Sequence, residues 1–460
     1  MIISNNPVIQ LKKFIILFFV YMIFEGILRK WILPNIQIYI YFVKDFLLIF
    51  IYFYAIKNNL LFNNRYSKLF IFFIIIISLY GLIGYHLDFN DILSYFLGVR
   101  SYWLYAPLAL IAVNVFDLDD LKKFFKINLY FIFPYFILVL WQGYSSYDSI
   151  INIGFNSLAD RPERPTAYFT YITQNVFYLT FLGACLFSKI SVTSNLTFKK
   201  FIYYSILIFV LLSIMILLKS RSVYLMIFAI IIYSFLTVLF VTKNNYFKLK
   251  KLIIIGVITP LLFLIAKISF NNAYEFSSVR HNSDSPKEMN LVIKHGGVEL
   301  NSLSLGKDIN NSITVYDLCE KHSSLCRIAN ELFVFATIND SSLYGSGIGA
   351  GTSAVSAFKK VDKSFPLGES ENPRIIMELG YYVGTLFVLF KYFMSIFFHI
   401  LFLFKNKNKT FVSPFLFFTT ILLLLGPITY SASFISFIFW FSLSFLLISF
   451  KNPKVKKYYL

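Results

Sequence analysis

Residues 343–384 read LYGSGIGAGTSAVSAFKKVDKSFPLGESENPRIIMELGYYVG and join a long polar segment of this chain to an apolar one. They close a long polar segment, residues 270–373, and lead into an apolar stretch. Almost everything outside that segment is apolar enough for a bilayer. We expect a chain of this kind to carry its specialised residues in the polar segment or at the membrane surface beneath it.

The composition indicates a membrane protein. Of the 460 residues, 58% are hydrophobic and 14% are charged, whereas a soluble domain has about 25% charged residues. The formal net charge of +19 has a topological explanation, given below, so nucleic acid is not an expected partner. No small-residue cleavage site follows the first apolar run, and we expect no cleavable signal peptide.

We expect an all-α, polytopic integral membrane protein with about twelve transmembrane helices, because about 20 apolar residues cross a bilayer. The expected spans are 14–33, 36–56, 68–86, 92–116, 125–143, 168–187, 201–218, 223–241, 252–269, 374–404, 412–430 and 432–450. They divide the chain into residues 1–269 with the first nine spans, the large loop 270–373, and residues 374–460 with the last three.

Basic residues orient a membrane chain, because cytoplasmic loops carry an excess of lysine and arginine. If the N-terminus is in the cytoplasm, the lysine-rich segments all fall inside, and the bias stays in phase through every expected span. Both termini are therefore expected in the cytoplasm, and the loop 270–373 is expected outside.

Arginine is distributed differently from lysine. Of the nine arginines, only Arg65 lies in a segment expected inside. The others lie on the outer side or within a span: Arg29, Arg100, Arg161, Arg164, Arg221, Arg280, Arg327 and Arg374. A planar guanidinium binds phosphate through two parallel hydrogen bonds, so this distribution indicates an anionic ligand at the outer face. The alternative is that each arginine lies at a helix end and pairs with a nearby carboxylate.

Arg100 lies in the apolar run YFLGVRSYWLYAPLALI. An arginine within the bilayer costs about 3 kcal/mol unless it faces the bundle interior or a wet cavity. Gly98 and Pro107 would permit a bend that opens such a cavity. The alternative is a structural ion pair with Asp45 or Glu25.

Four further arginines lie in short or patterned outer segments. Arg161 and Arg164 occur in ADRPERPTAYF, where the prolines stiffen the loop, and Arg221 occurs in the short connection LLKSRSVYL. Arg327 begins CRIANELFVFATIND, an amphipathic helical pattern. Each of them is a candidate for binding the ligand, and the alternatives are a solvated loop or an ion pair with neighbouring glutamates.

The glycine run GSGIGAG and the polar patch after it complete the candidate site. No strand precedes the run and no Gly-Lys-Ser/Thr follows it, so it predicts a sharp turn rather than a nucleotide loop. Glu369 and Glu371 precede the expected span 374–404, in which Arg374 and Glu378 share one helix face. A carboxylate beside arginines could deprotonate a hydroxyl while a phosphate leaving group is held. The alternative is an ordinary capped helix end.

Two cysteines, Cys319 and Cys326, lie in the expected outer loop. We expect a disulfide between them, provided that their geometry permits it, because that compartment is oxidising. No histidine or cysteine spacing in the loop resembles a set of metal ligands, so we expect neither a metal nor another cofactor.

At these residues the chain resembles the O-antigen ligase and polymerase superfamily of bacterial surface-polysaccharide assembly. The similarity rests on Ser-Arg-Ser at 220–222, on Arg327, and on LYGSGIGAG followed by ELGYYVG; EGILRKWILP and GVRSYWLYAPL are also similar to relatives. The resemblance implies a GT-C-like bundle with one large periplasmic loop. The ligase branch typically has a histidine where this chain has Glu369, which favours the polymerase branch.

The resemblance implies polymerisation of polyprenyl-diphosphate-linked repeat units at the outer face of the bacterial cytoplasmic membrane. Glu369 would be the base and Arg221 a catalytic cation. The expected substrate-binding residues are Arg100, Arg161, Arg164, Arg327, Arg374, Glu371 and Glu378. The alternatives are a ligase-type transferase acting on another acceptor, such as lipid A core, and a flippase or transporter of lipid-linked sugar. The expected partners are the lipid-linked glycan donor and acceptor, the bilayer and, as a further candidate, a chain-length regulator protein.

Overall fold

The structure, a computed structural model, describes most of the apolar part of the chain. The described residues are 6–62, 65–86, 92–145, 149–153, 164–193, 196–241, 245–270, 332, 344–349, 371–405, 409–426 and 433–450. Most of the expected outer loop lies outside these ranges, as do the candidate disulfide of Cys319 and Cys326 and the site residues Arg161, Arg327 and Glu369. The predictions about them stay predictions.

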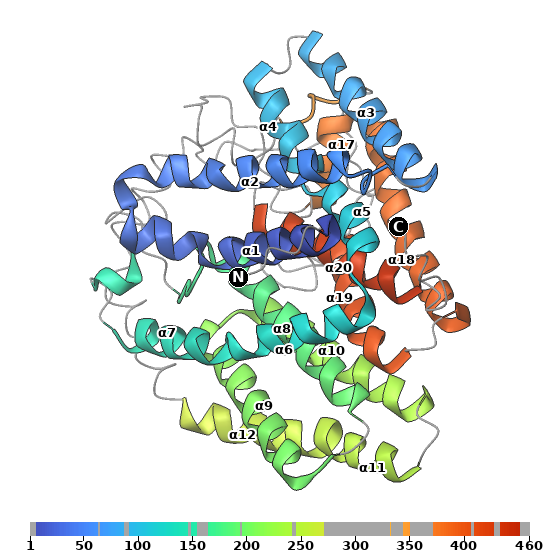
Figure 1. Ribbon diagram of the computed structural model, residues 1–460. Helices are drawn as coiled ribbons and strands as arrows, with labels where there is room; N and C mark the ends of the chain where they lie inside the picture. The colour runs from blue at the N-terminus through green and yellow to red at the C-terminus, as the bar shows by residue number, and fades with distance from the viewer. Residues whose placement is uncertain are drawn as a thin grey trace, which may run out of the picture.

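The described residues form helices and no strand (Figure 1). The helices are α1 (Pro7–Ile27), η1 (Leu28–Ile32), η2 (Pro34–Ile36), α2 (Gln37–Lys57), α3 (Arg65–His86), α4 (Ile92–Trp103), α5 (Ala106–Val115), α6 (Leu118–Tyr130), α7 (Ile132–Tyr144), η3 (Ile150–Asn152), α8 (Ile172–Val192), α9 (Phe198–Leu218), α10 (Arg221–Val241), α11 (Asn245–Ile253), η4 (Ile254–Ile258), α12 (Thr259–Ser269), α17 (Glu371–Leu379), α18 (Tyr381–Lys405), α19 (Lys409–Leu425) and α20 (Ser433–Phe450).

Within the described ranges, nine helical stretches are long and apolar enough to cross a membrane. They are Pro34–Lys57, Ile92–Val115, Leu118–Tyr144, Ile172–Val192, Phe198–Leu218, Arg221–Val241, Lys248–Ser269, Tyr381–Phe404 and Ser433–Phe450. The expected spans 14–33, 68–86 and 412–430 correspond to α1, α3 and α19, which are not among the nine. The α1 helix carries charged residues towards both ends, and the apolar parts of α3 and α19 are shorter. The helical class and the membrane character are thus confirmed, and twelve spans and a GT-C-like arrangement stay predictions.

Helices α8 and α20 lie at the centre of the bundle. Buried residues make up 89% of the apolar stretch of each. Helix α8 contacts α6, α9, α10 and α19, and α20 contacts α5 and α19. Phenylalanine rings in edge-on or tilted contact join α1, α6 and α20; they belong to Phe19, Phe124, Phe437, Phe441 and Phe445. Each such ring pair contributes about 0.5–1.5 kcal/mol beyond the burial of its area.

The peripheral helices expose apolar side chains. Only 22% of the stretch Pro34–Lys57, 22% of Lys248–Ser269 and 28% of Tyr381–Phe404 is buried. Their exposed side chains include Phe46, Phe53, Ile268 and Phe404. Soluble monomers rarely expose contiguous apolar patches above a few hundred Å², so these surfaces suit contact with lipid.

The lysine-rich helix ends gather on one side of the bundle. Lys12 near the start of α1 forms an ion pair with Asp120 in the first turn of α6. Lys251 of α11 donates a hydrogen bond to the Ser191 carbonyl at the end of α8. Segments that are expected inside are therefore neighbours in space, as a common cytoplasmic side requires.

Among the expected spans that are divided into separate helices, 92–116 and 374–404 bear on the site. The stretch 92–116 is α4 and α5, which meet at a turn at Leu104 and Tyr105, with Pro107 at the start of α5. The stretch 374–404 is α17 and α18, which Gly380 separates with a φ of 81°. Only glycine adopts such a φ without strain. Arg374 and Glu378, expected within a span, therefore lie on a separate short helix before it.

Candidate functional site

Two networks of charged side chains meet at helix α4. Arg100 on α4 bonds to α2, and Tyr102, two residues later, bonds to α17. We call the first group the α2 network: Glu25, Arg29, Tyr41, Lys44, Asp45 and Arg100. We call the second the α17 network: Tyr102, Glu371, Arg374 and Glu378. Figure 1 shows α4 and α17 beside each other, above α2.

Arg100 and Asp45 form the core of the α2 network. The Arg100 Nε lies 2.6 Å from Asp45 Oδ2, and its Nη2 lies 3.0 Å from Asp45 Oδ1. Its Nη1 donates to the Tyr41 hydroxyl at 3.0 Å. This two-point geometry is the one in which arginine binds a carboxylate most strongly. The structural ion pair that the sequence left open for Arg100 is therefore present, with Asp45 as the partner.

Glu25 joins α1 to the same network. The chain turns back after α1 through η1 and η2, so Glu25 of α1 faces Lys44 of α2 across the hairpin. The Lys44 Nζ donates to both Glu25 oxygens at 2.8 and 2.9 Å, and Arg29 Nη1 donates to Oε1 at 3.2 Å. Lys44 Nζ also lies 3.6 Å above the centre of the Tyr41 ring. The six side chains of the α2 network thus hold three cations against two carboxylates, an excess of one positive charge.

The α17 network has the opposite balance. Arg374 Nη1 donates to Glu378 Oε1 at 2.9 Å, and its Nη2 donates to Glu371 Oε2 at 3.1 Å. The Tyr102 hydroxyl donates to Glu378 Oε2 at 2.7 Å. Burial alone would lower the pKa of Arg374, but the carboxylates of Glu378 and Glu371 hold this pKa above its ordinary value. Arg374 is 1% exposed, so a stable charge there depends on both carboxylates.

Polar contacts fix α17 to the helices that follow it. Lys391 of α18 donates to Asn372 Oδ1 at 2.7 Å, and the Asn372 amide donates to the Leu424 carbonyl of α19 at 3.2 Å. Gly384 of α18 lies so close to α17 that a Cβ there would be 2.4 Å from the Ile376 Cα. A glycine at this position therefore permits the close approach of α17 and α18.

The glycine run lies between α4 and α17. Gly345, Gly347 and Gly349 all have positive φ, of 77°, 92° and 96°. Ser346 N donates to the Met377 carbonyl at 2.9 Å, and Gly347 N donates to the Glu378 carbonyl at 3.0 Å. The predicted turn is confirmed, and its backbone covers the end of α17.

Residues 164–171 form a strap across the end of α1. Lys30 Nζ donates to the Ala167 carbonyl at 2.6 Å and to Thr166 Oγ1 at 3.0 Å. Gln142 Oε1 accepts from Ala167 N at 2.7 Å, and the Asn175 amide donates to the Pro165 carbonyl at 2.9 Å. The strap is therefore tied to three helical segments.

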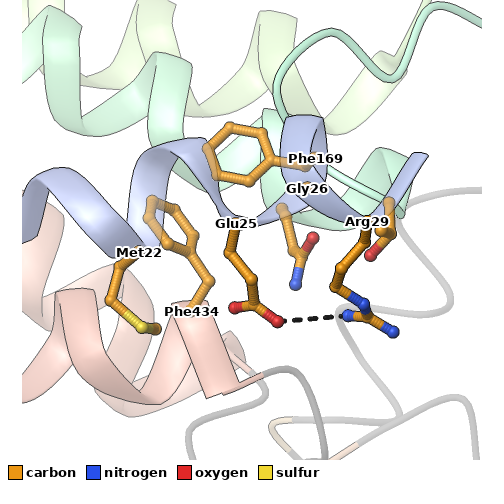
Figure 2. A pocket seen from close by; sticks show the side chains of 8 residues that line it. Met22, Glu25, Gly26, Arg29, Phe169 and Phe434 are labelled. Atoms are coloured by element: carbon orange, nitrogen blue, oxygen red, sulfur yellow. Dashed lines mark hydrogen bonds and ion pairs between the residues drawn. The ribbon is translucent and has the colours of Figure 1, made fainter. Parts of the chain in front are cut away.

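A pocket lies beside the α2 network, where α1, the end of the strap and the start of α20 meet. It is small, with room for about one water molecule, and is lined by Met22, Glu25, Gly26, Arg29, Phe169, Thr170, Gln174 and Phe434. Figure 2 shows Glu25 of α1 and Arg29 of η1 next to each other, joined by their ion pair, with Met22 and Phe434 on the other side of Glu25.

The structure brings some of the predicted site residues together and not others. Arg100 lies in the α2 network, and Arg374, Glu371 and Glu378 form the α17 network. Arg164 is exposed on the strap, and Arg221 is exposed as the first residue of α10. Residues Arg161, Arg327 and Glu369 are not described. The described candidate arginines thus occupy two networks and two exposed positions, and an anionic ligand bound by arginines stays a prediction.

Several residues of the site were not singled out from the sequence. Lys44, Tyr41, Tyr102 and Lys30 belong to this group, and Glu25 and Asp45 were considered only as structural partners. The available signal was the pair Lys44-Asp45 inside the apolar run QIYIYFVKDFLLIF, because ionisable residues in a membrane helix mark functional sites by default.

Among the described residues, no group of three or more His, Cys, Asp and Glu side chains is placed to hold a metal ion. Comparisons of the chain with protein-family models, with curated proteins and with solved structures gave no match.

Proposed function

We propose that the chain is a membrane glycosyltransferase that polymerises polyprenyl-diphosphate-linked oligosaccharide units into a surface polysaccharide at the outer face of the bacterial cytoplasmic membrane. The observation that carries the proposal is the pair of buried charged networks, linked by α4, within a bundle of apolar helices. Burying this many charges is costly, and membrane proteins retain them chiefly where a polar substrate is handled.

The α2 network lies nearer those ends of α1 and α2 that are opposite their lysine residues Lys12 and Lys57. Lys12 lies in the first turns of α1 and Glu25 in the last, and Lys57 ends α2 whereas Asp45 lies nearer its start. A polyprenyl-diphosphate sugar keeps its chain in lipid and its phosphates at the interface. On the proposed topology these helix ends lie on the outer side, where such a donor would present its diphosphate.

The four described candidate arginines divide into two roles in this proposal. Arg100 is held by Asp45 and joins α4 to α2, whereas Arg374 is held by Glu371 and Glu378 within α17. Arg221 and Arg164 are exposed and can present a guanidinium fork to phosphate. Arg221 also begins a helix of 21 residues, where backbone N–H groups favour an anion. We assign contact with the diphosphate to these two.

The reaction has a simple balance. A hydroxyl oxygen of the acceptor glycan bonds to the anomeric carbon of the donor, and the bond from that carbon to the diphosphate oxygen breaks. The acceptor proton passes to a carboxylate, and arginines stabilise the charge that develops on the leaving diphosphate. Glu371 and Glu378 already accept hydrogen bonds from Arg374, so Glu369 stays the first prediction for the base.

Reconstitution tests the proposal. The purified chain in liposomes is given lipid-linked oligosaccharides extracted from a host strain that lacks it. We expect a ladder of products that differ by one repeat unit, with one polyprenyl diphosphate released per bond formed, both measured by mass spectrometry.

Three results would contradict polymerisation. One is transfer of a single glycan to added lipid A core without a ladder, which would identify a ligase. Another is movement of the intact lipid-linked glycan across the bilayer without bond formation, which would identify a flippase. The third is unchanged substrate.

A further inference from the structure

Four lysines from three helices lie near one another on the lysine-rich side of the bundle. They are Lys122 and Lys126 in the second and third turns of α6, Lys189 in the last turn of α8, and Lys200 in the first turn of α9. The ammonium groups of Lys122, Lys126 and Lys200 are all close enough to that of Lys189 to repel it. We call these four residues the lysine cluster.

Lys189 occupies an unusual position on α8. Every residue of this helix from Asn175 to Ser191 is buried except Lys189, which is half-buried. A lysine in such a position packs its methylene groups against apolar neighbours and keeps its ammonium group in the polar region. Orientation of the chain in the membrane requires only that lysines lie on the inner side. A fully exposed lysine such as Lys199 meets that requirement, so the placement of Lys189 calls for another explanation.

Contacts between the three helices hold the cluster on a fixed framework. The Thr193 hydroxyl, directly after α8, bonds with the Tyr204 hydroxyl of α9 at 2.8 Å. Helix α8 packs against both α6 and α9. Tyr130 at the end of α6 is close enough to Tyr203 of α9 to interact with it electrostatically. The four lysines are therefore brought together by packed helices and not by a loop.

The cluster carries more positive charge than its neighbours neutralise. Lys122 forms an ion pair with Asp119, in which both side chains are well exposed. Within the described ranges, no carboxylate forms an ion pair with Lys126 or Lys189. Like charges at close range repel, most strongly where water is partly excluded. An anion from outside the chain would offset this repulsion.

Exposed apolar side chains lie next to these lysines on the same helices. They are Ile127 of α6, Val192 of α8, and Phe198 and Ile202 of α9. Tyr130 is also exposed and lies on the same face of α6 as Lys126, four residues before it. Tyrosine is typical of the membrane interface. A ligand at this surface meets cations and apolar groups together, which matches a phospholipid better than a soluble anion.

We infer that the lysine cluster binds the phosphate group of an anionic phospholipid, whose acyl chains lie along the exposed apolar side chains of α6, α8 and α9. Lysine is a compact charge that attracts phosphate without a fixed geometry. Basic sites between membrane helices bind anionic lipid headgroups in this way. The bound lipid offsets the repulsion around Lys189 and so stabilises the packing of the three helices. The inference does not depend on the proposed reaction, whose residues lie elsewhere in the bundle.

Native mass spectrometry of the full chain tests the inference. The chain is purified in a non-ionic detergent that removes bound lipid. It is then titrated with phosphatidylglycerol, with phosphatidylcholine, which has no net charge, or with glycerol 3-phosphate, a soluble analogue of the headgroup. We expect phosphatidylglycerol to bind about tenfold more tightly than phosphatidylcholine, and its binding to weaken as ammonium acetate is added. Glycerol 3-phosphate should displace the lipid only at far higher concentration, because it lacks the acyl chains.

Two double variants locate the site. Lys126→Gln with Lys189→Gln removes two charges from the cluster, and should weaken phosphatidylglycerol binding about 30-fold. The matched control, Lys57→Gln with Lys267→Gln, removes two charges from exposed positions on α2 and α12 and should bind as the original chain does. Thermal unfolding provides a second readout. In lipid-free detergent the cluster variant should unfold at a higher temperature than the original chain, because repulsion is relieved, and added phosphatidylglycerol should raise that temperature less.

Four results would overturn the inference. Equal binding of phosphatidylglycerol by the two double variants would place the lipid elsewhere. Equal binding of the two phospholipids would show that charge does not select the ligand. Displacement by glycerol 3-phosphate at the same concentration as the lipid would show an anion site that makes no use of the acyl chains. A cluster variant less stable than the original chain in lipid-free detergent would contradict the repulsion that the lipid is inferred to offset.

Discussion

The α2 network and the α17 network are built from the same side-chain types but differ in charge and access. The α2 network holds three cations and two carboxylates and borders a pocket. The α17 network holds one cation between two carboxylates, and the backbone of the glycine run covers it. The first carries a net positive charge beside a small pocket, and the second is a closed structural anchor with a net negative charge. Helix α4 belongs to both, so a change in one network can reach the other.

Removal of Arg374, the cation of the α17 network, is expected to lower the stability of the chain more than any other change proposed here. Arg374→Met leaves the carboxylates of Glu371 and Glu378 buried without their cation, which costs about 3–5 kcal/mol. Thermal unfolding in detergent should show a variant that is largely unfolded or absent from the membrane. Neutralising the carboxylates as well, with Glu371→Gln and Glu378→Gln, should restore much of the stability. If Arg374→Met alone were as stable as the original chain, the stability of α17 would not depend on these ion pairs.

Removing a carboxylate from the α2 network should have a smaller effect. Asp45→Asn weakens two charged hydrogen bonds of Arg100, whose side chain is 13% exposed and keeps the Tyr41 hydroxyl. We expect a loss of about 1.5–3 kcal/mol of unfolding free energy, measured by the same assay. Asp119→Asn is the control, because Asp119 is 78% exposed in its pair with Lys122 and such pairs contribute about 0–1 kcal/mol. If Asp45→Asn and Asp119→Asn lowered the unfolding free energy equally, the buried ion pair would contribute no more to stability than the surface pair.

The packing of the glycine run over the α17 network can be tested by adding one methyl group to a glycine. Gly349→Ala places a Cβ 2.2 Å from the Ser94 carbonyl oxygen at a φ of 96°. We expect a loss of about 1–3 kcal/mol from strained backbone, with α4 displaced from α17. Gly143→Ala is the matched control, since its Cβ would meet only Leu217 at 3.8 Å. Unchanged stability of Gly349→Ala would mean that the glycine run does not pack as described.

Part of this arrangement follows from local sequence. Apolar runs predict the helices, and the glycine run predicts the turn, because both depend on residues close in the chain. Arg100 within an apolar run required a partner, and Asp45 was one of two candidates. The sequence could not choose between them, since the choice depends on how α1, α2 and α4 pack.

The parts that could not be predicted depend on contacts between distant residues. Tyr102 and Glu378 are bonded although 276 positions separate them, and Lys30 reaches Ala167 from 137 positions away. Nothing local to Gln174 indicates that it lines a pocket with Glu25. The division of the expected span 374–404 at Gly380 was also missed, because glycine is common within membrane helices.

The central claim is that Arg221 holds the donor diphosphate through its guanidinium fork. The most direct test of this claim compares Arg221→Lys with Arg65→Lys. Both keep the charge and lose the guanidinium fork. Arg221 is exposed at the start of α10, and Arg65 is the arginine expected on the inner side. Each should change the unfolding free energy by less than about 0.5 kcal/mol. In liposomes supplied with lipid-linked oligosaccharide, Arg221→Lys should slow ladder formation about 100-fold, as expected for a lost donor to the developing charge, and Arg65→Lys should leave it unchanged. Normal ladder formation by Arg221→Lys would contradict a role for this arginine in holding the diphosphate.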